Sequence, residues 1–314
     1  MNLSRACIAG RALLVALPAI LFATSGCSIK RLAVNKLGDA LAGGGTTFAA
    51  DDDPELVKAA VPFSLKLMES LLNESPQHKG LLFATSSGFT QYGYAFVQQD
   101  ADELEAKDFG AAEALRARAK RLYLRARNYG LRGLEVAHRG FTNQLAADPH
   151  VAVARLTKRD VPQAYWTAAA WGAAVSLSKD DPAIVAQIPQ MEALIDRALA
   201  LDESWDSGAI HGFLINYEMS RQGAPGDPAA RARKHFDRVL ELTKGQQAGP
   251  LVTFAEAVCI EKQDAKQFED LLNRALAINA DAHPETRLVN LIMQRRAKWL
   301  LSRKEDLFLT VEKK

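Results

Sequence analysis

Residues 81–99 read LLFATSSGFTQYGYAFVQQ, and this stretch contains no charged residue although 24% of the chain is charged. It contains no proline, and Phe89, Tyr92 and Phe96 recur at the i, i+3 and i+7 spacing of a helix face. The other faces carry hydroxyl and amide groups where a surface helix would carry Lys and Glu. Because an unpaired buried charge costs much more than a hydrogen-bonded hydroxyl, this pattern predicts a central helix enclosed by other helices.

The rest of the chain also has the composition of helices. Ala, Leu, Arg and Glu are frequent, and β-branched runs bounded by turns, which mark strands, are nearly absent. Asp-Pro pairs put a capping aspartate before a proline at the first helical position, and they predict helix starts at 53–54, 181–182 and 227–228. Residues 161–178, VPQAYWTAAAWGAAVSLS, form a second uncharged helix. The sequence therefore predicts an all-α protein.

A repeat is visible in the second half of the chain. Three predicted helices end alike, with RALAL at 197–201, RVLEL at 238–242 and RALAI at 274–278. These intervals are near the roughly 34 residues of a tetratricopeptide repeat. A helical hairpin cannot bury its apolar face alone, so we expect irregular tetratricopeptide-like hairpins stacked into a compact solenoid over residues 53–314. Gly88, Gly172 and Gly212 are the expected points of close helix approach.

The N-terminal segment, residues 1–26, has the pattern of an export signal. Arg5 and Arg11 are followed by an apolar run of roughly 11 residues and then by small residues. This run is shorter than the roughly 20 residues that cross a bilayer. Residues 24–27, TSGC, resemble a bacterial lipoprotein processing box, which predicts acylation of Cys27; the alternative is an ordinary cleaved signal with a bystander cysteine. Ser28 after the cysteine is typical of sorting to the outer membrane, on its periplasmic side.

Residues 27–52 lie between this signal and the first predicted helix start. Leu32, Leu37 and Leu41 have the spacing of a short amphipathic helix, which the glycines at 43–45 would end. These glycines lack the flanking strand and the Lys-Ser/Thr of a phosphate loop. We therefore expect a lipidated flexible tether over 27–52. With Cys27 acylated and Cys7 removed, Cys259 has no partner for a disulfide.

Composition excludes several classes of function. The chain has 39 Lys and Arg against 37 Asp and Glu, so removal of Arg5 and Arg11 with the signal leaves 37 of each. A neutral chain argues against a nucleic-acid partner, which requires a concentrated basic face. The six histidines lack metal-ligand spacing, and no nucleophile elbow, phosphate loop or dinucleotide motif is present. We expect no enzyme activity, no metal and no cofactor.

Basic residues are concentrated between positions 116 and 132: Arg116, Arg118, Lys120, Arg121, Arg125, Arg127 and Arg132. Helical spacing predicts that they spread around the helix, and acidic residues lie just before them. A solvated, salt-bridged helix is favoured here over an anion site. His211 precedes Gly212 on a predicted packing face, and we interpret it as a hydrogen-bonded core histidine.

Three segments carry a resemblance to a known family: DDDPELVKAAVPFSLKLMESLL at 51–72, SGFTQYGYAFVQQDADELE at 87–105 and RLYLRARNYGLRGLE at 121–135. They are similar to the T component of the TPR-protein-associated TRAP transporters, from about residue 51 to the C-terminus. The resemblance implies a periplasmic lipoprotein with a tetratricopeptide-like fold that associates with the TRAP substrate-binding protein. It also implies a homotrimer with a passage through each protomer, and no catalytic residues.

Two hypotheses on function follow. In the first, the protein serves solute uptake by holding or passing a small organic ligand, anionic or apolar, along a central passage for a binding-protein partner. In the second, it is an envelope scaffold that binds proteins through its helical surface. The two uncharged helices favour the first, although a well-packed core would also explain them. The side chains expected to line the passage come from these helices: Phe89, Gln91, Tyr92, Tyr94, Gln98, Tyr165, Trp166 and Trp171.

Overall fold

The computed structural model describes residues 34–43 and 45–309. Over these residues the chain forms helices and turns, with no strand, which confirms the predicted all-α class. The helices of 12 or more residues are α3 (Pro54–Glu74), α4 (Lys79–Tyr92), α6 (Phe109–Ala137), α9 (Val161–Ser176), α11 (Ile188–Leu201), α12 (Ala209–Ser220), α13 (Pro228–Thr243), α15 (Ala265–Leu276) and α16 (Arg287–Ser302). Shorter helices are α2 (Gly45–Ala49), α5 (Gln99–Leu104), α7 (Phe141–Ala147), α8 (Pro149–Ala154), α10 (Pro182–Val185), α14 (Ala248–Phe254) and α17 (Lys304–Leu307).

The Asp-Pro pairs mark helix starts as predicted. Asp53 caps α3 by accepting hydrogen bonds from the backbone nitrogens of Glu55 and Leu56. Asp181 and Asp227 cap α10 and α13 in the same way. A capping aspartate accepts from backbone N–H groups that have no partner inside the helix, and the proline lacks one of those N–H groups.

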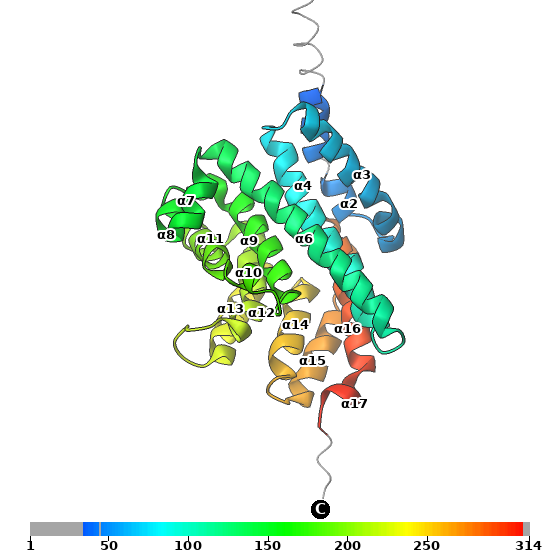
Figure 1. Cartoon of the computed structure of the whole chain (residues 1–314). Coiled ribbons are helices and arrows are strands. Elements are labelled where there is room, and N and C mark those ends of the chain that lie inside the picture. Colours follow the sequence, from blue (N-terminus) through cyan, green and yellow to red (C-terminus); the bar gives the residue numbers. More distant parts are fainter. Residues whose placement is uncertain (1–33, 44, 310–314) are drawn as a thin grey trace, which may run out of the picture.

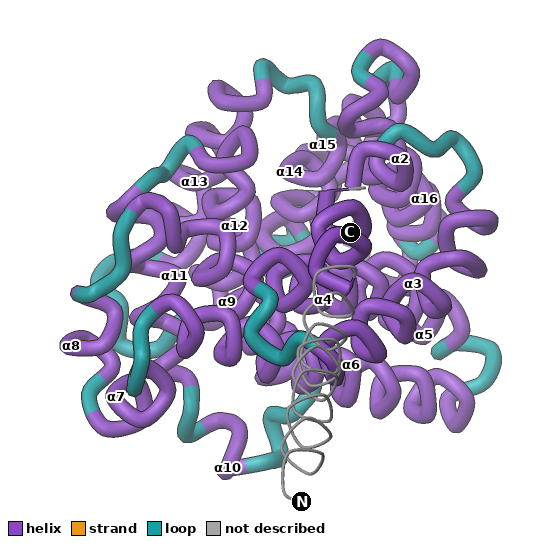
Figure 2. The backbone as a smooth tube through the Cα atoms, turned by 90° about the horizontal axis from the view of Figure 1, so that it is seen from above, coloured by secondary structure: helices purple, strands orange, loops and turns teal. Residues whose placement is uncertain are grey.

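The uncharged stretch, residues 81–99, lies within one continuous run of helix. This run consists of α4, the π-helical turn η1 (Gly93–Gln98) and α5. The helix α4 packs against α3, α6 and α9, and in Figure 2 it lies in the middle of the molecule with these helices around it. The prediction of a central, enclosed helix is confirmed.

Hydrogen bonds explain how α4 keeps polar groups in the core. Ser86 Oγ donates to the backbone oxygen of Ala126 on α6 (2.9 Å), and Thr90 Oγ1 donates to that of Ser86 (2.8 Å). Both side chains are buried. A hydroxyl bonded to a backbone oxygen costs little when it is buried, whereas Lys or Glu at the same positions would require a buried counter-charge.

The later helices pack as successive hairpins. The helix α9 pairs with α6 and α11, α12 pairs with α13, and α14 pairs with α15 (Figure 1). One apolar cluster joins α9 and α11, around Met191 and Leu194. Another joins the hairpins from α13 to α16, around Phe236 and Phe268. The predicted helical-hairpin architecture is therefore present.

The C-terminal helix α16 closes the fold by returning to the N-terminal helices. It contacts α2 and α3, and Ile292 is buried in the same cluster as Phe89 and Tyr92. Arg295 pairs with Asp100 (2.9 Å) and Glu103 (2.7 Å), and Arg296 pairs with Asp102 (2.8 Å). These contacts join residues that lie nearly 200 positions apart in the sequence.

The structure differs from the expected flexible tether over part of residues 27–52. Residues 34–43 are helical, as is α2, and both pack on the domain. Ser75 Oγ donates to Asn35 Oδ1 (2.8 Å), and Arg287 Nη1 donates to the backbone oxygen of Ala50 (2.9 Å). The described folded part therefore begins by residue 34. Apolar contact and hydrogen bonds to later helices hold residues 34–43 and α2 on the domain, and contacts of this kind cannot be read from the local sequence.

Two of the three expected glycine contacts are present. A Cβ on Gly88 would lie 2.8 Å from Leu65 Cδ2, and one on Gly172 would lie 2.9 Å from Phe213 Cζ. The expectation for Gly212 is wrong, because a Cβ there would meet no atom within 4 Å. Among the described glycines, Gly130 of α6 has the least room for a side chain, because an added Cβ would lie 2.3 Å from Thr167 Oγ1 and 3.0 Å from Ser86 Oγ.

Candidate functional site

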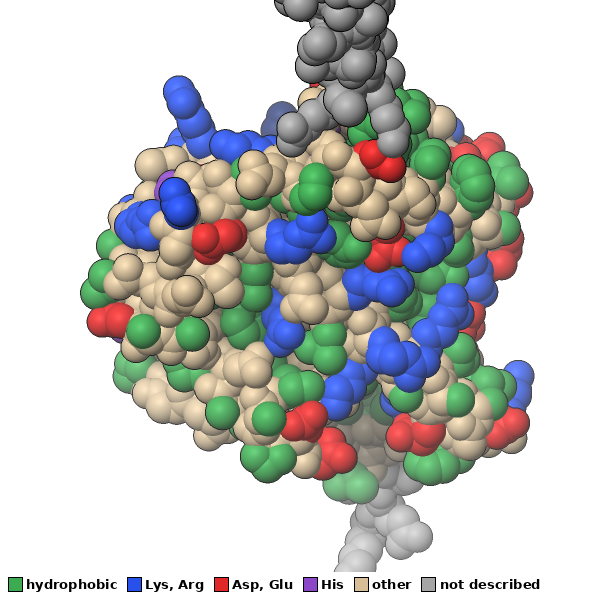
Figure 3. All heavy atoms as spheres, turned by 45° about the horizontal axis from the view of Figure 1, so that its top comes forward, with side chains coloured by type: hydrophobic (Ala, Val, Ile, Leu, Met, Phe, Trp, Pro, Cys, Tyr) green, Lys and Arg blue, Asp and Glu red, His purple; other side chains and the backbone are tan. Residues whose placement is uncertain are grey.

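Four arginines share one face of α6. Arg118, Arg121, Arg125 and Arg132 recur at intervals of three, four and seven residues, which is the spacing of one helix face. We call these four side chains the arginine face. Figure 3 shows Lys and Arg side chains gathered across the side of the molecule that α6 crosses. The expectation that the basic residues of α6 spread around the helix holds only for the others.

The other basic residues of α6 have local partners. Arg116 pairs with Glu105 (2.8 Å) and Glu113 (2.8 Å), and Lys120 pairs with Asp181 (3.4 Å). Arg127 Nη1 donates to Gln187 Oε1 (2.9 Å). The ion pairs of Arg116 and Lys120 are the salt-bridged arrangement that the sequence predicts, whereas Arg127 bonds to an uncharged amide.

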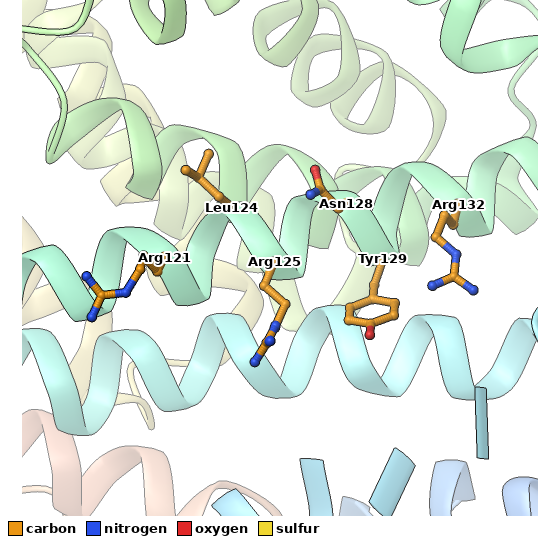
Figure 4. Close-up of a pocket in the computed structure, with 6 residues that line it drawn as sticks. All are labelled: Arg121, Leu124, Arg125, Asn128, Tyr129 and Arg132. Carbon is orange, nitrogen blue, oxygen red and sulfur yellow. The ribbon is translucent and has the colours of Figure 1, made fainter. Parts of the chain in front are cut away.

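A surface groove of about 410 Å³ follows the arginine face. It is lined by Arg121, Leu124, Arg125, Asn128, Tyr129 and Arg132. Figure 4 shows the three arginines and Tyr129 extending to the same side of α6, over the neighbouring α4. The groove therefore combines guanidinium groups with one aromatic ring and one aliphatic side chain.

Aromatic rings of α4 and α6 support the guanidiniums from below. Arg118 lies over the Tyr92 ring with its Cζ 5.8 Å from the centroid, and Arg125 lies over Phe89 at 5.4 Å. Arg132 lies over Tyr129 at 5.1 Å, and Tyr129 stacks on Phe89 with 6.3 Å between centroids. A guanidinium packed on a ring keeps its N–H groups available at the edge, where they can bind an anion.

One carboxylate is held beside the groove. Glu69 of α3 is buried; it accepts a hydrogen bond from Tyr129 Oη (2.9 Å) and pairs with Arg125 (3.2 Å) and Lys66 (2.6 Å). Burial, and then the hydrogen bond to Glu69, raise the pKa of Tyr129 to about 12, so its hydroxyl is protonated at neutral pH. Arg118 and Arg121 form no ion pair with any described residue, and the groove keeps a surplus of positive charge.

Among the side chains predicted to line a central passage, some of those from α4 and η1 lie beneath this groove. Phe89 and Tyr92 are buried and form its aromatic floor together with Tyr129, while Gln91 is exposed. In η1, Tyr94 is 45% exposed and Gln98 is half-buried. Gln98 Oε1 accepts a hydrogen bond from the buried Tyr123 hydroxyl (2.7 Å).

Tyr94 stands beside the ion pairs that close the fold. Its pKa is raised to about 12, first by desolvation and then by the nearby carboxylate of Glu256. The positive charge of Arg296 acts in the opposite direction. Tyr94 is thus an uncharged, partly exposed phenol next to Arg296, Glu256 and Asp102.

The candidates from α9 form a second aromatic group. Tyr165 is buried, lies edge-on to the half-buried Trp166 (5.0 Å between centroids) and contacts Trp205 (4.9 Å). Trp171 is buried beneath Arg127, whose Cζ lies 5.1 Å from its ring centroid. The structure brings α4 and α9 side by side, but these aromatics pack into a different cluster from Phe89 and Tyr92.

A strained turn adjoins this second group. Asp206 and Ser207 have φ values of 47° and 54°, and Gly208 follows at 88°. Non-glycine residues adopt positive φ rarely, and such strain persists where the surroundings impose it. Desolvation raises the pKa of Asp206. Sequence reasoning missed this turn because only its glycine has a recognisable signature.

The described residues offer no site for a metal. They contain no group of three or more His, Cys, Asp or Glu side chains able to hold an ion. Cys259 is buried with a free thiol, and burial raises its pKa to about 12. Within the same residues, every helix is too short or too polar to span a bilayer. Cys27, the predicted acylation site, lies outside the described residues.

Two histidines form a buried pair. His211 Nδ1 of α12 and His235 Nδ1 of α13 are 2.8 Å apart, so one ring donates a hydrogen bond to the other. The other nitrogen of His211 faces Glu203 (3.3 Å), which Arg238 also holds. The interpretation of His211 as a hydrogen-bonded core histidine is confirmed. Burial is the main cause that lowers the pKa of both rings, and it outweighs the attraction of Glu203 on His211.

This pair predicts loss of stability in mild acid. Because both folded-state pKa values lie below the unfolded value of about 6.5, the unfolded chain takes up protons first as the pH falls. Stability is therefore complete above about pH 6.5 and falls below it, by up to about 1.4 kcal/mol per pH unit for each excess proton. Urea unfolding of the wild type and of His235→Gln, from pH 7.5 to 5.5, measures this slope.

The slope should be smaller in His235→Gln, while His150→Gln, which replaces an exposed histidine, should keep the wild-type slope. Equal slopes in all three proteins would show that the His211–His235 pair does not govern this pH range.

The fold defines an all-α protein of packed helical hairpins, and comparison with known proteins identifies its family. The family model described as TRAP transporter T-component matches residues 50–308. The chain belongs to this family, as the three quoted segments indicate, and is thus a component of a TRAP transport system. The chain is also similar to an uncharacterized protein of Treponema pallidum (strain Nichols), with 30% identity over 303 residues. The alignment covers 91% of this chain and 94% of that protein.

Proposed function

We propose that this protein acts without catalysis as the accessory component that binds the periplasmic substrate-binding protein of its TRAP system. Membership of the T-component family carries the proposal. The arginine-lined groove supports it, because positively charged and aromatic side chains on an exposed helix face are common at protein interfaces. A homotrimer of tetratricopeptide-like protomers is part of the proposal, and sedimentation would give three times the monomer mass.

Ligand handling is the second part of the proposal. The aromatic group of Tyr165, Trp166 and Trp205 lies beside a strained turn, and Tyr94 offers a partly exposed phenol in η1. Apolar walls with a few placed polar groups are typical of sites for small organic ligands. Such side chains would hold or pass a small organic ligand while the binding protein is docked.

The partnership is tested by titrating the full-length chain, purified in detergent, with the TRAP-type substrate-binding protein of the same organism. We expect a complex with a Kd in the micromolar range, because two proteins confined to one compartment need little intrinsic affinity. The titration is run with and without the solute of the binding protein, and a difference in affinity would support ligand handling. No binding at several hundred micromolar would remove the transport role and favour an envelope scaffold.

Anchoring at the periplasmic side of the outer membrane is proposed through Cys27. Several acyl chains, at roughly 0.8 kcal/mol per buried methylene, hold a protein on a membrane firmly. Cys27→Ser should therefore move the protein from the membrane fraction to the soluble fraction, as immunoblots of fractionated cells would show. Cys259→Ser, which changes a buried thiol, is the control and should stay with the membrane. An unchanged distribution of Cys27→Ser would disprove the anchor.

A further inference from the structure

We propose that the arginine face of α6 is a docking surface for a protein partner, and that it binds an acidic helix or extended acidic segment of that partner. The inference rests on the proposed function, whose binding protein is the expected partner. Beyond that function, we assign the binding surface and the acidic groups that it recognises. Arg118, Arg121, Arg125 and Arg132 carry the argument, together with the aromatic rings beneath them.

The length of the arginine face indicates a macromolecular occupant. Fourteen residues separate Arg118 from Arg132, which corresponds to about 21 Å along a helix. A small organic anion would reach one or two of these guanidiniums, whereas a partner helix with carboxylates spread over about four turns, at i, i+3, i+7 and i+14, would match all four. Tyr129, which extends to the same side of α6 as the guanidiniums, also offers its ring for apolar contact in the groove.

Three of the four guanidiniums are held in position before a partner binds. Arg118, Arg125 and Arg132 are each supported by an aromatic ring, at 5.8, 5.4 and 5.1 Å from the centroid. An arginine that is already ordered loses less conformational entropy when it binds a carboxylate. These rings are also fixed, because Phe89 and Tyr92 are buried.

Three of the four arginines of this face have no carboxylate partner within the described residues; Arg125 alone pairs with one, Glu69 (3.2 Å). Arg121 is exposed and forms no ion pair or hydrogen bond with any described residue, whereas Arg116 and Lys120 on the other faces of α6 are paired. Arg132 Nη2 donates to the uncharged backbone oxygen of Pro76 (3.1 Å). The chain after residue 26 is neutral overall, so this surplus is local and complements an acidic surface.

The test compares two single charge reversals in the full-length chain. Arg121→Glu changes a side chain without internal partners, so the fold should be unaffected, and circular dichroism checks this. Lys234→Glu on the exposed side of α13 makes the same change in net charge. In titrations with the substrate-binding protein at 50 mM NaCl, Arg121→Glu should bind about 5- to 20-fold more weakly than the wild type. Lys234→Glu should stay within about twofold of the wild type, because it lies away from this face.

Ionic strength provides a second readout. Wild-type affinity should fall between 50 and 500 mM NaCl, and Arg121→Glu should show a smaller salt dependence. If the wild type binds and Arg121→Glu binds equally well, the docking surface lies elsewhere while the proposed function stands. If the wild type itself does not bind, the proposed function and this inference both fail.

Two further measurements distinguish an acidic protein partner from other anionic ligands of the groove. Thermal unfolding is followed with succinate or inorganic phosphate at 5 mM, and Cys27→Ser protein is sedimented with phosphatidylglycerol vesicles. Neither probe should distinguish wild-type from Arg121→Glu protein. An Arg121-dependent rise in the unfolding temperature would make the groove a small-anion site, and Arg121-dependent vesicle binding would make it a membrane-binding face. Either result would overturn the docking proposal.

Discussion

Replacing Arg296 with leucine should destabilise the folded protein by about 3 kcal/mol, because it leaves carboxylates without their partner in a largely buried network. Arg296 is 11% exposed at its side chain; it pairs with Glu256 and with Asp102 (2.8 Å). Its Cζ also lies 4.4 Å from the centroid of the Trp299 ring. In the variant, Asp102 would still pair with Arg116 (3.3 Å). The carboxylate of Glu256 would therefore lose more stabilisation than that of Asp102. Urea unfolding followed by circular dichroism at pH 7.5 measures the change.

Arg303→Leu is the matched control for this experiment. Arg303 lies near the same Trp299 ring (5.8 Å), but it pairs with Asp306 one helical turn away at the surface. Exposed pairs of this kind contribute about 0–1 kcal/mol, so the control should lose much less stability. If both variants lose the same free energy of unfolding, the loss comes from the contact with Trp299. The ion pairs between α16 and the N-terminal helices would then contribute nothing measurable.

Replacing Gly130 with alanine should destabilise the protein by about 1–3 kcal/mol through overpacking. The added Cβ would lie 2.3 Å from Thr167 Oγ1 and 3.0 Å from Ser86 Oγ. Neither hydroxyl is free to move, because Thr167 donates to the backbone oxygen of Gln163 (2.6 Å) and Ser86 to that of Ala126 (2.9 Å). The helices α4, α6 and α9 would have to separate around Gly130 to make room for the added methyl group.

Gly212→Ala is the control, since Gly212 also lies inside a helix but has open space where its Cβ would be. Alanine has the higher helix propensity, and this variant should be unchanged or more stable by about 0.5–1 kcal/mol. Thermal unfolding of the two variants beside the wild type gives the comparison. A stable Gly130→Ala protein would mean that the three helices have room to adjust.

The candidate site was predictable only in part. Uncharged helices at 81–99 and 161–178 identified the segments that pack together, because helix position and enclosure follow from local pattern. The sequence also contained the i, i+3 and i+7 spacing of Arg118, Arg121 and Arg125. We expected the basic residues to spread around the helix and did not single out these three, and spacing does not tell which basic residues find partners on other elements. Arg116 and Lys120 pair with carboxylates just before α6 and α10, whereas on the arginine face only Arg125 has a carboxylate partner, Glu69.

The sequence by itself determined the helical class, the helix starts at the Asp-Pro pairs and the enclosed helix α4, since each depends on residues within a few turns of one another. Three short segments of the sequence also indicated the family. Only the tertiary structure decided that α16 returns to α5 through Arg295 and Arg296, and that Gly130, not Gly212, is the site of close packing. It also decided that residues 34–43 and 45–49 pack on the later helices. Each depends on contacts between residues far apart in the chain, for which local periodicity carries no information.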